Sequence, residues 1–265
     1  MAKLLRAGSQ LLGGGGAFSP KSIASLQLWL DCNDLTTLFQ DTAGATPVTA
    51  DGQSVARIND KAASAALIQS TAGARPIYKA SIQNGRGVLR TDGNDSLSVS
   101  NISLLRNVAG ATVFAAVSGT KPGTAANVMQ VANGAATQRL ALWREETAGS
   151  LGVRGRRLDA DASQEVHGGT FTAGEWMIHA AWVDYTATSI RLYKNGGTAI
   201  ASSAAFQTAG NTSDTISLTT SILGGNLNGD LGGILLFGVA LTVAQMNQVG
   251  AWMAARWGLT WSAVS

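Results

Sequence analysis

The sequence has one cysteine, two histidines and few charged side chains among its 265 residues. The single cysteine, Cys32, excludes an intrachain disulfide, so the fold must be stabilised by burial of apolar side chains, and Cys32 itself is expected to be a small core residue. His167 and His179 are too few for a zinc site, which needs three or four closely spaced His or Cys ligands. The chain also has no Gly-x-Ser-x-Gly motif and no evident partner that would activate a cysteine or serine nucleophile.

Charged residues make up only 13% of the chain, against ~25% in ordinary soluble domains. The net charge of +3 is too small to indicate nucleic-acid binding without a focused basic patch. No run of about 18 or more apolar residues occurs, so we expect no membrane span. A weakly charged surface rich in small residues fits two classes equally well. One is a protein partly covered by neighbouring subunits, and the other is a secreted or extracellular β protein.

Residues 1–19 differ from the rest of the chain by containing four consecutive glycines, Gly13–Gly16. The segment fails as a signal peptide, because charged and polar residues interrupt its apolar part. We predict an N-terminal arm in which the glycines act as a hinge. Its leucines would dock into a groove of a partner: Leu4, Leu5, Leu11 and Leu12. An ordinary frayed terminus is the alternative.

The stretch Gly174–Gly197 predicts two strands joined by a short polar turn. The first strand, 176–183, carries apolar residues on both of its faces, as the period of two shows. Such a strand should lie in the middle of a sheet inside a two-layer structure, and His179 on it is expected to be a core residue. After the second strand, Asn195 and Gly196 tolerate positive φ angles, as a turn requires.

Further short strands recur at roughly ten-residue spacing with glycine-rich turns between them, which is typical of an all-β sandwich. They are expected at 26–30, 55–60, 77–80, 87–100 (two strands around a tight turn), 111–118, 128–131, 139–143, 150–154, 166–171, 198–202, 215–218 and 229–239. No linker or internal repeat divides the chain. Residues 20–265 are therefore predicted to form one domain that follows the arm.

One α-helix is predicted after the last strand. Thr242 and Gln245 form a capping box at its start, and Gly258 suits its C-terminal cap. Apolar residues between these caps recur at helical spacing, at Val243, Met246, Val249, Trp252, Met253 and Trp257. We expect this apolar face to pack on the sandwich.

Several stretches carry a family resemblance. They are LQLWLDCNDLTTLF (26–39), GRGVLRTDGNDSLSVS (85–100), GATVFAAVSG (110–119), GEWMIHAAWVD with IRLYKNG (174–196), and GDLGGILLFGVALTVAQMNQVGAWMAARWGL (229–259). Together they resemble the concanavalin A-like lectin/glucanase superfamily, in its laminin-G-like branch. The last stretch and 41–61 look like members borne by bacteriophages. The resemblance covers about residues 25–260. It implies a jelly-roll of two antiparallel sheets, in which glycan-binding and structural roles are both open.

Some members of this superfamily hydrolyse glycans, a reaction that needs two carboxylates ~5–9 Å apart. The family's catalytic pattern is Glu-x-Asp-x-Glu, and it is absent around the four glutamates of the chain, Glu145, Glu146, Glu165 and Glu175. Asp159 and Asp161 have a suitable alternation, but they lie in a polar run that predicts a solvated loop. We therefore expect no enzymatic activity.

A glycan site would need an exposed aromatic ring flanked by Asn, Asp or Arg side chains. The prediction for such a site is Trp143 beside Arg144, together with Tyr185 in the hairpin turn. Five of the other tryptophans are predicted to be core residues: Trp29, Trp176, Trp182, Trp252 and Trp257.

Arginines cluster in the middle of the chain, at Arg139, Arg144, Arg154, Arg156 and Arg157. The cluster suits a grip on an acidic neighbour or an anionic polysaccharide. A solvated hairpin is the interpretation that we favour. Aromatic residues do not alternate with these arginines as binding of single-stranded nucleic acid would require.

Calcium is the one cofactor left open, since lectin-like sandwiches often bind it through Asp, Asn and backbone carbonyl oxygens. The candidates crowd two turns, one with Asp92, Asn94 and Asp95, and one with Asp31, Asn33 and Asp34. Both patterns also describe ordinary turns, in which Asp and Asn side chains bond to their own backbone. The turn interpretation is the one that we favour.

The hypothesis drawn from these features is a non-enzymatic structural protein on the external surface of a bacteriophage virion. It would be a capsid decoration, a head fibre or a tail component, displaying a lectin-like sandwich and anchored by its arm. Its partners would be other virion proteins and further copies of itself, since virion appendages are commonly symmetric. The alternative is a carbohydrate-binding adhesin that recognises host glycans, and a glycoside hydrolase is the remote alternative.

Overall fold

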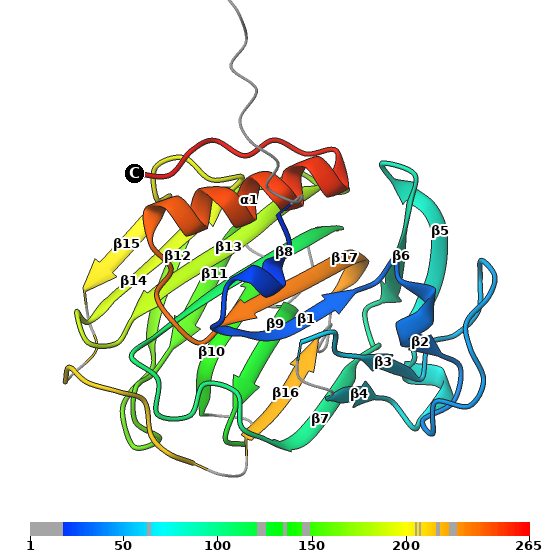
Figure 1. Cartoon of the computed structure of the whole chain (residues 1–265), viewed down its shortest axis with the longest axis horizontal. Helices are drawn as coiled ribbons and strands as arrows, with labels where there is room; N and C mark the ends of the chain where they lie inside the picture. Colours follow the sequence, from blue (N-terminus) through cyan, green and yellow to red (C-terminus); the bar gives the residue numbers. More distant parts are fainter. Residues whose placement is uncertain are drawn as a thin grey trace, which may run out of the picture.

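The computed structural model describes residues 18–62, 65–120, 126–134, 137–144, 149–204, 206, 208–215, 218–222 and 227–265. Two antiparallel sheets pack face to face, and one α-helix covers the outside of the first (Figure 1). The predicted all-β jelly-roll with a C-terminal helix is thereby confirmed. The leucines of the predicted arm, Leu4, Leu5, Leu11 and Leu12, lie outside the described residues, so the arm and its boundary with the domain stay predictions.

The first sheet, called sheet A, has eight strands within the described residues. Their order is β15 (Ala201–Ala204), β14 (Ser189–Lys194), β13 (Met177–Asp184), β8 (Gly110–Gly119), β17 (Asn228–Phe237), β6 (Arg86–Asp92) and β5 (Ile77–Gln83). The eighth strand, β1 (Leu26–Asp31), pairs with the second half of β17, whereas β6 pairs with its first half. Strands β1 and β6 thus lie end to end along one edge of β17.

The second sheet, called sheet B, has nine strands in the described part of the chain. Their order is β12 (Gln164–Thr170), β11 (Ser150–Gly155), β10 (Gln138–Arg144), β9 (Ala126–Ala132), β16 (Leu218–Ile222), β7 (Leu97–Ile102), β4 (Ala66–Ile68), β3 (Arg57–Asn59) and β2 (Leu38–Phe39). Short 3₁₀ turns occur at Pro20–Ser22, Leu35–Thr37 and Ala72–Ala74. Strand β2 has only two residues, and both pair with β3.

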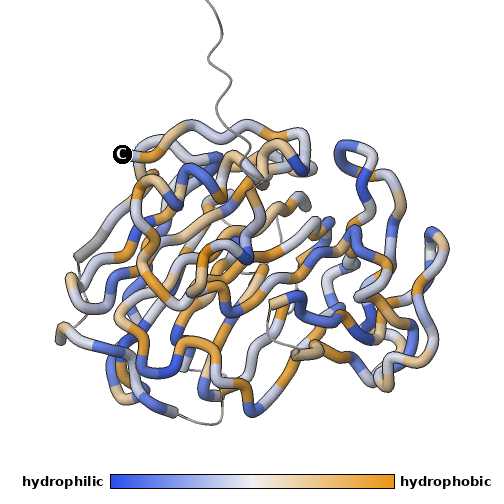
Figure 2. The backbone as a smooth tube through the Cα atoms, viewed as in Figure 1, coloured by the Kyte–Doolittle hydropathy of each residue, from blue (hydrophilic) through white to orange (hydrophobic). Residues whose placement is uncertain are grey.

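The core consists of two layers, one between the sheets and one between sheet A and the helix. Strand β8 shows how the sequence builds both layers. Val113 and Val117 belong to the inter-sheet cluster, whereas Phe114 and Ala116 belong to the cluster under the helix. All ten residues of β8 are buried, as expected for a central strand with two covered faces. Apolar residues accordingly gather on the inner strands, and hydrophilic ones on peripheral loops (Figure 2).

The hairpin predicted at Gly174–Gly197 is confirmed as β13 and β14, paired from His179 with Lys194 to Asp184 with Ser189. Strand β13 lies between β14 and β8, which is the mid-sheet position that its two apolar faces predict. The two strands predicted at 87–100 also exist, but they do not pair with each other. The turn between them carries the chain from sheet A to sheet B.

The helix α1 (Val243–Trp257) begins and ends where its caps predict. Thr242 and Gln245 form the reciprocal capping box, and Gly258 has a φ of 61° at the C-terminal cap. The adjoining ends of β5 and β6, with the loop between them, close the last turn, because Arg86 Nε at the start of β6 donates to the carbonyl oxygen of Arg256 at 2.6 Å. Gln83 Nε2 donates to the carbonyl oxygen of Trp257 at 2.8 Å. These residues therefore satisfy carbonyls that a helix end leaves unpaired.

No helix in the described ranges is both long enough and apolar enough to cross a membrane.

Candidate functional site

The structure does not offer an exposed ring at the residues predicted to bind glycan. Trp143 is 4% exposed and its ring lies against Gly152, where a Cβ would come within 2.3 Å. His167 contacts its edge, and the Arg154 guanidinium lies over its face. Arg144 and Tyr185 are fully buried, and the Tyr185 hydroxyl donates to the carbonyl oxygen of Arg139 at 3.0 Å. The prediction of an exposed platform at Trp143, Arg144 and Tyr185 is wrong.

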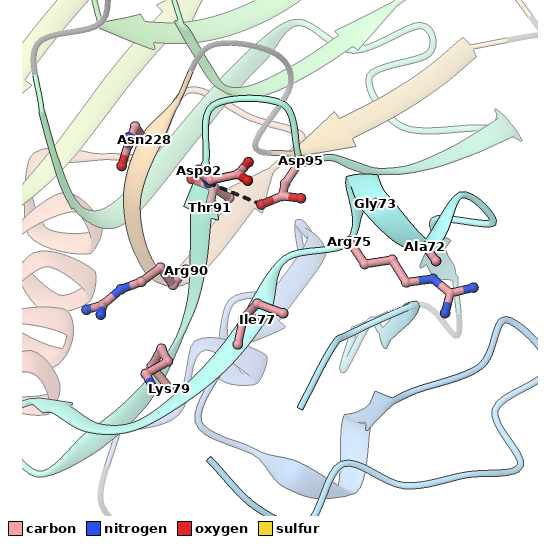
Figure 3. A pocket seen from close by; sticks show the side chains of 10 residues that line it. All are labelled: Ala72, Gly73, Arg75, Ile77, Lys79, Arg90, Thr91, Asp92, Asp95 and Asn228. Atoms are coloured by element: carbon pink, nitrogen blue, oxygen red, sulfur yellow. Dashed lines mark hydrogen bonds between the residues drawn. The ribbon is translucent and has the colours of Figure 1, made fainter. Parts of the chain in front are cut away.

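The turn proposed for calcium lines a cleft of about 570 Å³ beside β5 and β6, with Asp92 and Asp95 next to each other at one end (Figure 3). Asp92 Oδ1 accepts from the backbone N–H of Asn94 at 3.3 Å, and Asp95 Oδ2 accepts from that of Asp92 at 3.2 Å. Burial, together with the charge of Asp92, raises the pKa of Asp95. These are the side chain-to-backbone bonds of an ordinary turn.

The cations of the same cleft are already engaged. Lys79 Nζ lies 2.6 Å from Asp51, and Arg90 donates to both carboxylate oxygens of Asp230 at 2.7 and 2.9 Å. Arg75 is directed away from the carboxylates (Figure 3) and donates to backbone carbonyl oxygens. The described residues that line this cleft include no aromatic side chain. No group of three or more His, Cys, Asp or Glu side chains suited to a metal occurs among the residues that the structure describes.

A second cleft, of about 540 Å³, is lined by aromatic rings and by charged side chains of both signs. We call it the tryptophan cleft. It is lined by Phe18, Ser19, Trp29, Asp31, Asn33, Asp34, Leu35, Lys61, Arg86, Trp252 and Arg256. Its lining carries three cationic and two carboxylate side chains, and both of its tryptophans are half-buried. It therefore combines aromatic rings with Asn, Asp and Arg side chains, as expected of a glycan site, but at other residues than those predicted.

Local periodicity brings these side chains together. In β1, Leu28 and Leu30 face the inter-sheet core, so Trp29 and Asp31 face outward by the period of two. In α1, Trp252 and Arg256 are four residues apart and share one face of the helix. Because α1 packs on the outer face of sheet A, this helix face meets the outer face of β1. The loop after β1 then supplies Asn33 and Asp34.

The two tryptophans pack edge to face, with ring centroids 5.7 Å apart and planes at 85°. A cation covers each ring: Lys61 Nζ lies 4.6 Å from the centroid of Trp29, and the Arg256 guanidinium lies 5.6 Å from that of Trp252. Such contacts stabilise by about 0.5–1 kcal/mol at exposed sites. The cations also hold the rings in a fixed orientation.

One carboxylate organises the cations. Asp31 has a side chain that is 3% exposed, and both of its oxygens accept from Arg256 Nη2, at 2.8 and 2.7 Å. Its Oδ2 also lies 3.3 Å from Lys61 Nζ, which bonds to Asp34 at 2.6 Å. The carboxylates of this turn are therefore bound by cations. Asn33 is also engaged, because its Oδ1 accepts from the backbone N–H of Gly87 at 2.8 Å.

The charge pair at the rim of the cleft should make stability depend on pH. Although burial opposes it, hydrogen bonds from Lys61 and Thr36 hold the pKa of Asp34 below its usual value. A lowered pKa in the folded state stabilises the fold above the unfolded value of about 3.9, and the effect is lost as pH falls through the folded pKa. We expect Asp34→Asn to destabilise the protein at pH 7 and to destabilise it progressively less as pH falls below about 3.9. Urea unfolding across this range measures the difference, and a constant difference would contradict the assignment.

The other predicted sites are internal or lie outside the described residues. Arg139 is fully buried and donates to Leu105, Ser213 and Asp159, so it fastens loops at the end of the sandwich. Arg154 pairs with Glu165. The interpretation of this arginine cluster as a solvated hairpin is therefore wrong for Arg139 and Arg144, which are both fully buried. Cys32 and His179 are core residues, as predicted. Glu145 and Glu146 lie outside the described residues.

No family model matches the chain, and no curated protein matches it. Among solved structures, it is similar to the binding domain of botulinum neurotoxin serotype D, with a TM-score of 0.53 and 11% identity over 89% of this chain and 55% of that one. It is also similar to the binding domain of botulinum neurotoxin DC, solved in complex with SialylT, with a TM-score of 0.52 and 11% identity over 87% of this chain and 51% of that one. The chain spans about half the length of these neurotoxin domains.

A further similarity is to domain 4 of an extracellular arabinanase from Geobacillus stearothermophilus, solved in complex with arabinotriose, with a TM-score of 0.49 and 14% identity over 85% of this chain and 98% of that one. At 11% identity, the similarity to the neurotoxin domains shows that this chain shares their fold.

Proposed function

We propose that this protein is a non-enzymatic carbohydrate-binding sandwich and that the tryptophan cleft holds the sugar. The observation that carries the proposal is the pair of half-buried rings, Trp29 and Trp252, fixed at 85° to each other and bordered by charged side chains. Sugar rings present C–H groups that pack on an aromatic face, and hydroxyl groups that bond to charged and amide side chains at its edge. Asn33, Asp34 and Arg86 stand at that edge.

The binding test uses two tryptophans of similar surroundings. Trp252→Ala should weaken glycan binding roughly two- to tenfold, since the loss of an aromatic contact of ~0.5–1.5 kcal/mol corresponds to that range. Trp182→Ala is the matched control, because the Trp182 ring is also half-buried under a cation, Arg191 at 4.7 Å, but does not line the cleft. A glycan array followed by calorimetry on the best hit measures both. No binding by the wild type, or equal losses in both variants, would refute the proposal.

We further propose that the sandwich is displayed on the outside of a bacteriophage particle as a capsid, head-fibre or tail component. The support is the resemblance of 41–61 and 229–259 to phage-borne domains, the low content of charged residues, and the sequence of the arm, with its leucines and Gly13–Gly16. Recognition of host glycans and attachment to the particle are compatible, because they use different parts of the chain.

Removing the arm tests the attachment. Deletion of residues 1–17 spares Phe18 and Ser19 of the cleft, so we expect the shortened protein to fold and bind glycan but not to enter particles. Full-length Trp252→Ala is the converse control, since it should enter particles normally but bind glycan more weakly than the wild type. Quantifying each protein in purified particles gives the result. A shortened protein that is incorporated normally would rule out the arm as the anchor.

A further inference from the structure

Two basic side chains meet inside the sandwich, away from the tryptophan cleft. Arg144 ends β10 in sheet B, and His179 lies in β13 of sheet A; both are fully buried. His179 alternates with Met177 and Ala181 of the inter-sheet core, and Arg144 is two residues beyond Leu142 of the same core. Both side chains therefore enter the space between the sheets from opposite sides.

The pair offers hydrogen-bond donors without an acceptor. Within the described residues, none of the three guanidinium nitrogens of Arg144 and neither ring nitrogen of His179 has a hydrogen-bond partner. The Arg144 guanidinium instead stacks on the ring of Phe171, 3.9 Å from its centroid. One flat face is covered in this way, and the edges, where the N–H groups point, are not satisfied.

The nearby acid is already engaged. Glu175 is the carboxylate whose charge acts on Arg144, but its oxygens accept from Lys194 at 2.6 Å and from the backbone N–H of Thr172 at 2.9 Å. Its side chain is 28% exposed, at the rim of the sandwich. Glu175 and Lys194 neutralise each other, so among the residues that the structure describes the buried charge of Arg144 has no counterion of its own.

Burial of an unpaired cation is among the costliest arrangements in a protein interior. Desolvation lowers the pKa of Arg144 to about 10 in spite of Glu175, which still leaves it charged at pH 7. Burial, with a further contribution from Arg144, lowers the pKa of His179 to about 3, so its ring is neutral and keeps one N–H donor. The backbone of Gly119 packs against the guanidinium, since a Cβ there would lie 3.0 Å from Nη1, yet it accepts no hydrogen bond from it.

We propose that this cluster of Arg144 and His179 binds a small anion between the two sheets, either a halide or the carboxylate of a small acid. The N–H groups of Arg144 supply the charge and most of the donors, and the N–H of His179 adds one. The anion neutralises the buried cation and ties sheet A to sheet B at this end of the sandwich. The site is independent of the tryptophan cleft and of any glycan.

The test compares the thermal unfolding of three proteins as sodium chloride or sodium acetate is raised from about 5 to about 200 mM. A ligand that binds only the folded state raises the unfolding midpoint. The wild type should gain roughly 3 °C or more over Arg144→Met. Arg106→Met is the control with the same loss of charge, because Arg106 lies at the surface in a pair with Asp214. It should respond as the wild type does, which separates the site from general salt effects.

The two salts distinguish the source of the anion, since a larger response to acetate indicates a carboxylate ligand and a larger response to chloride a halide. An equal response of wild type and Arg144→Met to both salts would overturn the proposal, because it would mean that the chain itself neutralises Arg144. If Arg144→Met fails to fold, the line width of ³⁵Cl in solutions of the wild type decides. Broadening that added acetate removes supports the site. The proposal is overturned if no broadening occurs and acetate does not raise the unfolding midpoint of the wild type.

Discussion

Replacing Trp257 by alanine is expected to lower the free energy of unfolding by about 3–5 kcal/mol, the usual cost of removing a large buried aromatic side chain. Trp257 is 1% exposed and belongs to the core under the helix. Its ring stacks on that of Trp176, with centroids 6.2 Å apart and planes at 5°. Val243→Ala, on the exposed side of the same helix, should change stability by less than about 0.5 kcal/mol. Urea unfolding of both variants measures the difference.

A double mutant shows whether the loss comes from this packing. Gly232 lies under the ring of Trp257, and a Cβ there would come within 2.8 Å of its atoms. Gly232→Ala should therefore destabilise the wild type but be tolerated when Trp257 is already alanine. The two changes would then be strongly non-additive, as expected of residues in contact. Simple additivity would show that the indole does not rest on Gly232.

The second large effect is expected at Asp31. Asp31→Ala should cost about 2–3 kcal/mol, because it removes the charged hydrogen bonds of a buried carboxylate and leaves Arg256 without this partner. It should also weaken glycan binding, since these cations hold the two indole rings of the cleft in place. Stability is measured by urea unfolding and binding by calorimetry.

Asp51→Ala is the matched control, because Asp51 also bonds to a lysine, Lys79, but is 50% exposed. Exposed pairs of this kind contribute little to stability, because water screens the two charges. We expect this variant to remain nearly as stable as the wild type and to bind glycan normally. Equal losses in the two aspartate variants would contradict the organising role given to Asp31.

The sequence predicts most of the fold because its signals are local. The period of two identifies β13 as a strand with two covered faces, and the spacing of Thr242 and Gln245 marks the start of α1. The connection between β6 and β7 was harder to predict. Two strands around a tight turn have the same sequence pattern whether they pair with each other or belong to different sheets. Which sheet each strand joins depends on contacts between residues far apart in the chain.

The candidate site was predicted poorly, for a related reason. Alternation tells which side chains share a face of a strand, but not what covers that face. Trp143 was expected to be exposed, yet Arg154, His167 and the bare backbone of Gly152 enclose it. Trp29 was expected in the core, yet α1 covers its face only in part. The charged residues near Trp29, at Asp31 and Asp34, were the one signal that could have indicated a wet surface there.

The position of β17 has a consequence for synthesis of the protein. This strand is the last of the sandwich in the chain, and it pairs with β8, β6 and β1 in the middle of sheet A. A ribosome-bound chain that has not reached residue 228 therefore exposes the edges of three strands whose partner is missing. Such edges favour aggregation, and pairings between distant residues form slowly. We expect folding to be complete only after the whole sandwich has left the ribosome. Until then, chaperones would have to protect the unpaired strand edges from aggregation.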